Sequence, residues 1–149
     1  DCISAPVDNK SDLLIDVIYR ARFNNVPTAA AIKTVAPDGY NGNIELLIAV
    51  NIDGSVSGVR TLAHKETPGL GDKIELRKSP WITSFAGKKR LDENDNRWAV
   101  MKDGGMFDQF TGATITPRAV VKTVKKTIDY FQANQASIFA IDSNCGTKQ

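Results

Sequence analysis

The sequence lacks several features that would assign it quickly to a functional class. Its longest uninterrupted apolar run is the five residues 46–50, whereas a membrane-spanning helix needs about 20. A single histidine leaves no sign of a nucleophilic triad or a His-rich metal site. Neither GxGxxG nor GxxxxGK[ST] occurs, so neither a Rossmann nor a P-loop nucleotide site is supported. With 19 Lys and Arg against 17 Asp and Glu, the net charge is +2, which argues against nucleic-acid binding through a basic face.

The length and composition of the sequence are those of an ordinary globular protein. It has 149 residues, of which 42% are hydrophobic and 24% charged. A chain of this length buries enough surface for one core but too little for two. We therefore expect residues 1–149 to form a single domain, and the interspersed strand and helix patterns predict the α+β class.

The first half of the chain predicts one helix and a β-hairpin. Apolar residues spaced for one helical face follow a serine cap and predict a helix over 11–21. Residues 28–35 favour a strand. Two runs rich in Ile, Leu and Val, 44–52 and 55–62, flank Asp53–Gly54, and this dipeptide is a strong hairpin signal.

The second half predicts two helices and a short strand. Ser79 followed by proline predicts a short capped helix that ends near Phe85, and a polar loop follows over 88–96. Residues 97–101 are typical of a short strand. Thr116 followed by proline predicts the start of a long helix over 117–134. We expect its lysines to lie on a solvated face: Lys122, Lys125 and Lys126.

The turn before this long helix is a candidate anion site. Residues 108–117 combine small residues with three hydroxyls, those of Thr111, Thr114 and Thr116. Free backbone N–H groups and the helix dipole favour a phosphate at such a position, and Gly112 and Ala113 would let it approach closely. The alternative is that Thr116 only caps the helix.

Other polar residues give weaker signals. His64 is expected to be structural or exposed rather than catalytic. Glu66 and Asp72 could form a carboxylate pair, although nothing in the sequence specifies their geometry. Cys2 and Cys145 could form a bridge in an oxidising compartment or remain two thiols in a reducing one. Because two distant thiols are a poor redox pair, redox chemistry would need a borrowed cofactor.

Two segments carry a family resemblance. Residues 108–114, D-x-x-T-G-A-T, resemble the signature at which a flavin transferase attaches FMN through a phosphoester to the last hydroxyl. Residues 64–72, HKETPGLGD, are similar to a second block of the same FMN-binding domain family. The resemblance spans residues 38–131, and residues 39–42 and 112–121 look closer to its RnfG members than to its NqrC members.

The resemblance implies a set of site residues. Thr114 would carry the covalent FMN, and Asp108 would belong to the transferase recognition motif. Trp81 is a weaker candidate for a ring contact and is as consistent with a core position. The remaining implied cofactor-binding residues are Thr67, Gly69, Leu70, Gly71, Lys102, Thr111, Gly112, Ala113 and Thr116.

The resemblance also implies a function. The chain would be an electron-relay subunit of a membrane-bound, ion-translocating ferredoxin/NAD oxidoreductase complex of the Rnf type, rather than a stand-alone enzyme. Its partners would be the other membrane subunits and, during maturation, the flavin transferase. The family places this domain on the periplasmic face of the bacterial inner membrane, held by an N-terminal helix that a start at Asp1 suggests is missing here. A disulfide then becomes as plausible as free thiols. The alternative is an FMN-binding regulatory or sensory domain of another membrane protein.

Overall fold

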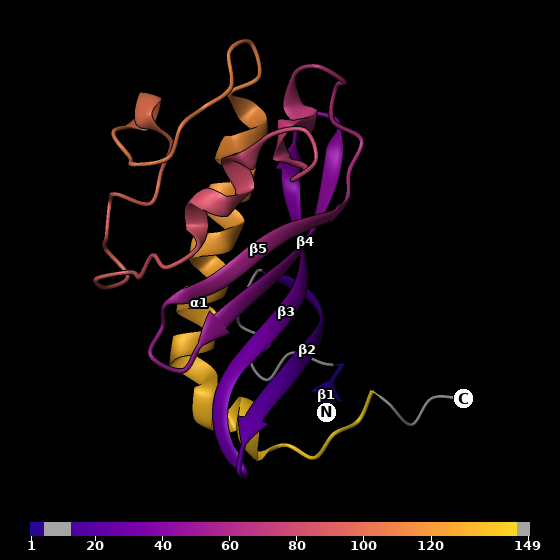
Figure 1. Cartoon of the computed structure of the whole chain (residues 1–149), viewed down its shortest axis with the longest axis vertical. Helices are drawn as coiled ribbons and strands as arrows, with labels where there is room; N and C mark the ends of the chain where they lie inside the picture. Colours follow the sequence, from indigo (N-terminus) through magenta and orange to yellow (C-terminus); the bar gives the residue numbers. More distant parts are fainter. Residues whose placement is uncertain (5–12, 146–149) are drawn as a thin grey trace.

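The fold is an antiparallel sheet covered on one face by a long helix (Figure 1). The computed structural model describes residues 1–4 and 13–145. Five strands lie in the order β1–β2–β3–β4–β5, each antiparallel to its neighbours. This arrangement confirms the predicted α+β class. The elements are β1 Cys2–Ile3, β2 Leu14–Phe23, β3 Val26–Gly39, β4 Gly42–Asn51, β5 Val56–Ala63, the 3-10 helices η1 Gly71–Ile74, η2 Pro80–Phe85 and η3 Met101–Asp103, and the helix α1 Ile115–Ala140.

Strand β2 replaces the helix predicted over 11–21, so that prediction was wrong. Its proposed cap, Ser11–Asp12, lies outside the described residues. The pairing of β2 with β3 shifts register between Ile15 and Val17, as in a β-bulge. An extra residue in the strand interrupts the alternation of inward and outward side chains. The apolar spacing therefore imitated a helical period.

The hairpin predictions are confirmed. Strands β4 and β5 join through the Asp53–Gly54 turn, in which Gly54 has φ +91°, a value that favours glycine. The predicted strand over 28–35 lies within β3. Alternate residues of β3 and β4 point toward α1 and are buried, and both strands contact that helix.

Helix α1 packs along the sheet through an apolar stripe. Val120, Val124, Ile128 and Phe131 are each almost fully buried, and burying such a side chain stabilises the fold by roughly 1.5–3 kcal/mol. The helix begins two residues before the predicted Pro117 and continues to Ala140 rather than to residue 134. A proline fits the first helical turn because its missing N–H has no partner there.

The lysines predicted to lie on a solvated face of α1 are unequally exposed. Lys122 is exposed, and its ammonium lies 2.8 Å from an Asp38 carboxylate oxygen. Lys125 and Lys126 are half-buried.

The first residues of the chain and the residues that follow α1 meet beside the C-terminal end of that helix. Cys2 and Cys145 form a disulfide with a Cα–Cα distance of 5.7 Å, which resolves the alternative that the sequence left open. The buried Arg20 guanidinium donates hydrogen bonds to the carbonyls of Ile138 and Ile141 and to the Asp1 carboxylate. It thereby satisfies orphan carbonyls of the helix end. Among the described residues, no helix is both long and apolar enough to cross a membrane.

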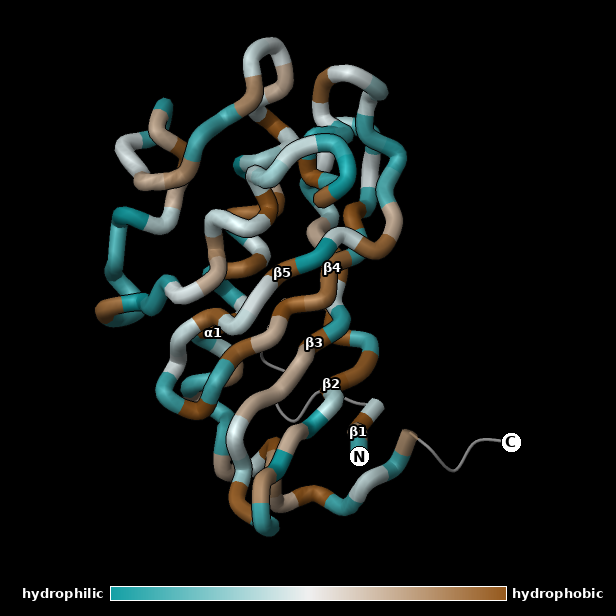
Figure 2. Tube along the Cα trace, in the orientation of Figure 1, coloured by the Kyte–Doolittle hydropathy of each residue, from teal (hydrophilic) through white to brown (hydrophobic). Residues whose placement is uncertain are grey.

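The segment between β5 and α1 is irregular and packs through aromatic rings. Trp81 is 7% exposed and makes edge contacts with Phe85 and Phe110, so it is a core residue. Ser79 caps η2 as predicted. The strand predicted over 97–101 was wrong, because only an isolated bridge forms, between Val100 and Phe107. The loop over 88–96 is mostly hydrophilic (Figure 2).

Candidate functional site

A pocket opens at the N-terminal end of α1. Its volume is about 540 Å³, within the range of roughly 300–1,000 Å³ usual for small-molecule sites. Its walls come from the β3–β4 turn, the loop after β5 with the start of η1, η3, the turn that precedes α1 and the first turn of α1 itself. The lining residues are Tyr40, Thr67, Leu70, Gly71, Lys102, Gly112, Ala113, Thr114, Ile115, Thr116 and Arg118.

Most of the candidate residues predicted from the sequence lie together in this pocket, although they are distant in the chain. Four candidates do not line the pocket: Gly69 and Thr111, which stand next to lining residues, and Trp81 and Asp108. Sequence reasoning did not assign Tyr40, Ile115 or Arg118 to the site. The sequence did contain a signal for Tyr40, because a large aromatic residue is unusual in a short turn bounded by glycines, here Gly39 and Gly42.

The first turn of α1 presents unpaired polar groups to the pocket. Thr114 is the N-cap residue, but its side chain makes no capping hydrogen bond. Within the described part of the chain, the backbone N–H groups of Thr114, Ile115 and Thr116 donate to no protein acceptor. Such N–H groups and the helix dipole attract an anion. The capping role predicted for Thr116 is wrong, because its hydroxyl has another partner.

That partner is Glu66, which is 4% exposed. Its carboxylate accepts hydrogen bonds from the backbone N–H groups of Tyr40 and Asn41, both at 2.9 Å, and from the Thr116 hydroxyl at 2.5 Å. We call this set of contacts the Glu66 clamp. It joins the β3–β4 turn, the loop after β5 and the start of α1. The clamp therefore fixes three walls of the pocket relative to one another.

The loop after β5 is held by contacts of its own. The Asp72 carboxylate accepts a hydrogen bond from the Gly69 N–H at 2.9 Å and lies 3.2 Å from the Lys78 ammonium. Burial alone would raise the pKa of Asp72, but these contacts together hold it below its ordinary value. Glu66 and Asp72 thus have separate sets of partners rather than forming the predicted carboxylate pair.

A glycine is required at position 71 because side chains of the clamp lie very close to its backbone. A Cβ at this position would lie 2.6 Å from the Thr116 Oγ1 and 3.0 Å from the Glu66 Cβ. The glycine therefore lets the loop pack directly against the clamp.

Two cationic side chains line the pocket. Arg118 forms a two-point ion pair with the Asp103 carboxylate, at 2.8 and 3.1 Å, and this pairing raises the pKa of the guanidinium further. Among the described residues, the Lys102 ammonium has no carboxylate within ion-pair distance. The pocket thus offers both positive charge and backbone donors to an anionic group.

Asp108 lies outside this pocket and is exposed. Its carbonyl accepts a hydrogen bond from the Trp81 indole N–H at 2.9 Å. This contact anchors the turn to the aromatic core and leaves the Asp108 carboxylate at the surface.

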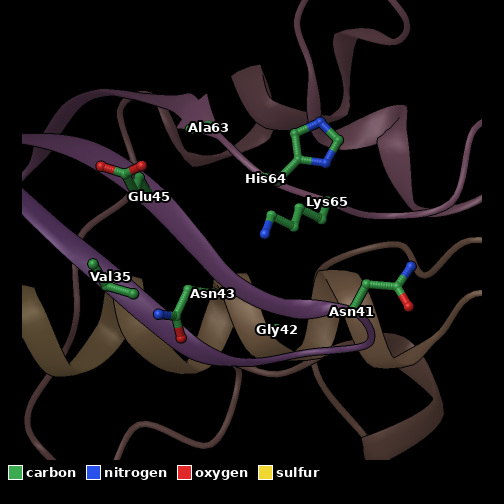
Figure 3. A pocket seen from close by; sticks show the side chains of 8 residues that line it. All are labelled: Val35, Asn41, Gly42, Asn43, Glu45, Ala63, His64 and Lys65. Atoms are coloured by element: carbon green, nitrogen blue, oxygen red, sulfur yellow. The ribbon is translucent and has the colours of Figure 1, made fainter.

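A second hollow, of about 510 Å³, lies at the ends of β3, β4 and β5 (Figure 3). In Figure 3 the Lys65 side chain extends over this hollow and the His64 ring points away from it. The His64 Nδ1 accepts the Glu66 N–H at 2.9 Å, and its Nε2 lies 3.7 Å from a Glu75 oxygen. These contacts fit the structural role predicted for His64. No group of side chains arranged for a metal ion occurs within residues 1–4 and 13–145.

Comparisons with known proteins agree with this geometry. The family model described as "FMN-binding domain" matches residues 39–129, a range that contains every residue lining the pocket. The fold is similar to that in the crystal structure of Shewanella oneidensis NqrC, with a TM-score of 0.59 and 23% sequence identity. That match covers 80% of this chain and 61% of the NqrC chain.

Closer sequence relatives are each named as the G subunit of an ion-translocating oxidoreductase complex. The protein from Shewanella oneidensis is 60% identical over 130 residues, which cover 87% of this chain and 61% of the relative. The protein from Vibrio atlanticus is 58% identical over 128 residues, with 86% and 61% covered. The chain thus spans about three-fifths of the length of these relatives. With more than half of its residues matched by the family model, the chain belongs to the FMN-binding domain family.

Proposed function

We propose that this chain is the flavin-bearing domain of an electron-transfer subunit in an Rnf-type, ion-translocating oxidoreductase complex, and that Thr114 carries FMN as a phosphoester. One observation supports Thr114 as the attachment residue. Thr114, at the N-terminus of α1, lines the pocket, and its hydroxyl makes no capping hydrogen bond. The similarity to proteins named as the G subunit of such complexes supports the wider role.

The residues of the pocket fit FMN in charge and polarity. Unpaired N–H groups at the start of α1 and the nearby Lys102 and Arg118 suit a phosphate. Leu70 offers an apolar surface, and the Thr67 hydroxyl and loop backbone offer polar contacts to the edge of a flat ring. A pocket that is mostly apolar with a few convergent polar groups is the usual form of a cofactor site.

The ester requires only that the Thr114 oxygen attack an activated FMN phosphoryl group. The new P–O bond forms as the donor's leaving group departs and the threonine proton is released. A flavin transferase would supply the donor and recognise the motif that begins at Asp108. Gly112 and Ala113 leave the backbone beside Thr114 unobstructed, because neither has a side chain beyond Cβ.

When bound, FMN supplies the electron transfer. The chain's own residues hold and tune it: the Glu66 clamp fixes the pocket walls, and Lys102 contributes positive charge. Within the complex, this domain would relay electrons between redox subunits during ferredoxin/NAD electron transfer coupled to ion movement. We place the domain on the periplasmic face of the inner membrane, in a protein anchored to that membrane.

The attachment site is tested by exporting the protein in cells that contain a flavin transferase. We expect intact mass to show one FMN ester and a denaturing gel to show a fluorescent band. Thr114→Ala should lose both signals while keeping the thermal unfolding midpoint, and Thr114→Ser should keep the label because it retains the hydroxyl. A label that persists in Thr114→Ala, or a wild type that never acquires one, would contradict the assignment.

The electron-transfer role needs a separate test in the assembled complex. Reduction of the attached flavin should occur during turnover, and Thr114→Ala should abolish electron flow while Thr114→Ser supports it. A labelled flavin that is never reduced during turnover would favour a regulatory or sensory domain instead.

A further inference from the structure

Tyr40 lies in an unusual position for a large aromatic residue. It is one of the two residues of the tight β3–β4 turn, and it is 66% exposed. It nevertheless lines the pocket at the start of α1, together with Leu70 from the loop after β5. Because most of its ring is in solvent, Tyr40 adds little to the core, and its position calls for another explanation.

The turn that carries Tyr40 is held by the buried carboxylate of Glu66. Both N–H groups of the turn, those of Tyr40 and Asn41, donate to the Glu66 carboxylate. The Asn41 side chain adds a second link by donating to the Thr67 hydroxyl at 3.2 Å. Hydrogen bonds to an ionised group are stronger than neutral ones. The turn is therefore held against two other walls of the pocket.

We propose that Tyr40, positioned by the Glu66 clamp, is a wall of the flavin site that packs against the cofactor's aromatic ring. This inference rests on the proposed function, because it requires FMN in the pocket. An aromatic side chain and an aliphatic one, Tyr40 and Leu70, reach the same pocket from separate segments. Flat aromatic rings gain stabilisation from contact with such surfaces. Glu66 would act on Tyr40 through the turn, as a positioning residue.

Flavin fluorescence of the covalently labelled protein tests the contact, since a tyrosine in contact with a flavin ring quenches its emission. We expect Tyr40→Leu to raise the emission of the labelled protein several-fold without lowering its thermal unfolding midpoint. Tyr19 offers a matched control, because it is 48% exposed and lies on β2 outside the pocket lining. Tyr19→Leu should leave the emission unchanged.

A double-mutant cycle tests the positioning role of Glu66. In Glu66→Gln, the side-chain amide would face a backbone N–H of the turn in place of an acceptor. We therefore expect the turn to loosen and flavin emission to rise. In the Tyr40→Leu background the same Glu66→Gln change should have no further effect on emission, because the quenching ring is already absent.

The possible outcomes separate the proposals. Unchanged emission in labelled Tyr40→Leu overturns the ring contact while leaving the flavin attachment intact. An equal effect of Glu66→Gln in both backgrounds overturns positioning through Tyr40. A wild type without flavin overturns this inference and the proposed function together.

Discussion

Substitutions at Thr116 distinguish a helix cap from a clamp. At an N-cap, aspartate is at least as favourable as threonine, so Thr116→Asp would be harmless. In the structure, however, the Thr116 hydroxyl donates to the buried Glu66 carboxylate at 2.5 Å. Thr116→Val keeps the shape but removes this hydrogen bond to a charged group, at a cost of about 1.5–3 kcal/mol. For a chain of this size, the expected fall in the unfolding midpoint is about 4–10 °C.

Thr116→Asp should cost considerably more than Thr116→Val. It removes the same hydrogen bond and also places a second carboxylate beside Glu66. Two like charges at roughly 4 Å repel by about 4 kcal/mol at an effective dielectric constant near 20. The combined loss approaches the whole free energy of unfolding of a typical domain, about 5–15 kcal/mol. We therefore expect Thr116→Asp to be barely folded at neutral pH.

The pH dependence of the same variant gives an independent check. A neighbouring carboxylate raises the pKa of the introduced carboxyl in the folded state above its usual value of about 3.9. A raised folded-state pKa contributes stability that is present at low pH and lost as the pH rises. The deficit of Thr116→Asp relative to wild type should therefore grow from about pH 4 toward neutral pH. Urea unfolding followed by circular dichroism measures it, and a variant as stable as wild type at pH 7 would refute the clamp.

Two further changes test contacts that stabilise the fold, one far from the pocket and one beside it. Reducing the Cys2–Cys145 disulfide, or replacing both residues with serine, opens a loop with a sequence separation of 143. The chain-entropy model gives a loss of about 5 kcal/mol in the free energy of unfolding. Unchanged urea unfolding under reducing conditions would contradict this expectation. Gly71→Ala forces a Cβ into the clamp and should cost about 1–3 kcal/mol, whereas Gly58→Ala, with nothing within 4 Å of the added Cβ, should unfold close to wild type. Equal effects of the two alanines would show that the close packing at Gly71 is unimportant.

Local signals predicted the elements that depend on local chemistry. The Asp53–Gly54 dipeptide favours a tight turn, and runs of apolar, β-branched residues flank it on both sides. These two local signals were enough to predict the β4–β5 hairpin. The capped start of η2 at Ser79 was predictable for the same reason. Strand β2 was not, because its bulge near Ile15 is fixed by pairing with β3, which has no signature within β2 itself.

The candidate site was predictable in its parts but not in its organisation. The small-residue turn before α1 marked an anion site, and the family resemblance added the loop after β5. The role of Glu66 depends on contacts with Tyr40 and Thr116, which lie 26 and 50 residues away in the chain. No spacing rule relates such positions. The C-terminal end of α1 was mispredicted for a similar reason, because Arg20 on strand β2 donates a hydrogen bond to a carbonyl at that end of the helix.

Helix α1 also determines how the two ends of the molecule relate to each other. Its 26 residues correspond to a rod of about 39 Å at 1.5 Å per residue. The pocket lies at the N-terminal end of this rod, and the Cys2–Cys145 disulfide lies near its C-terminal end (Figure 1). This distance is several times the Debye length of about 8 Å at physiological ionic strength. Charges near the disulfide, such as the Asp1 carboxylate, are therefore largely screened by salt from the pocket, so a change of charge there should leave the electrostatics of the pocket nearly unaltered.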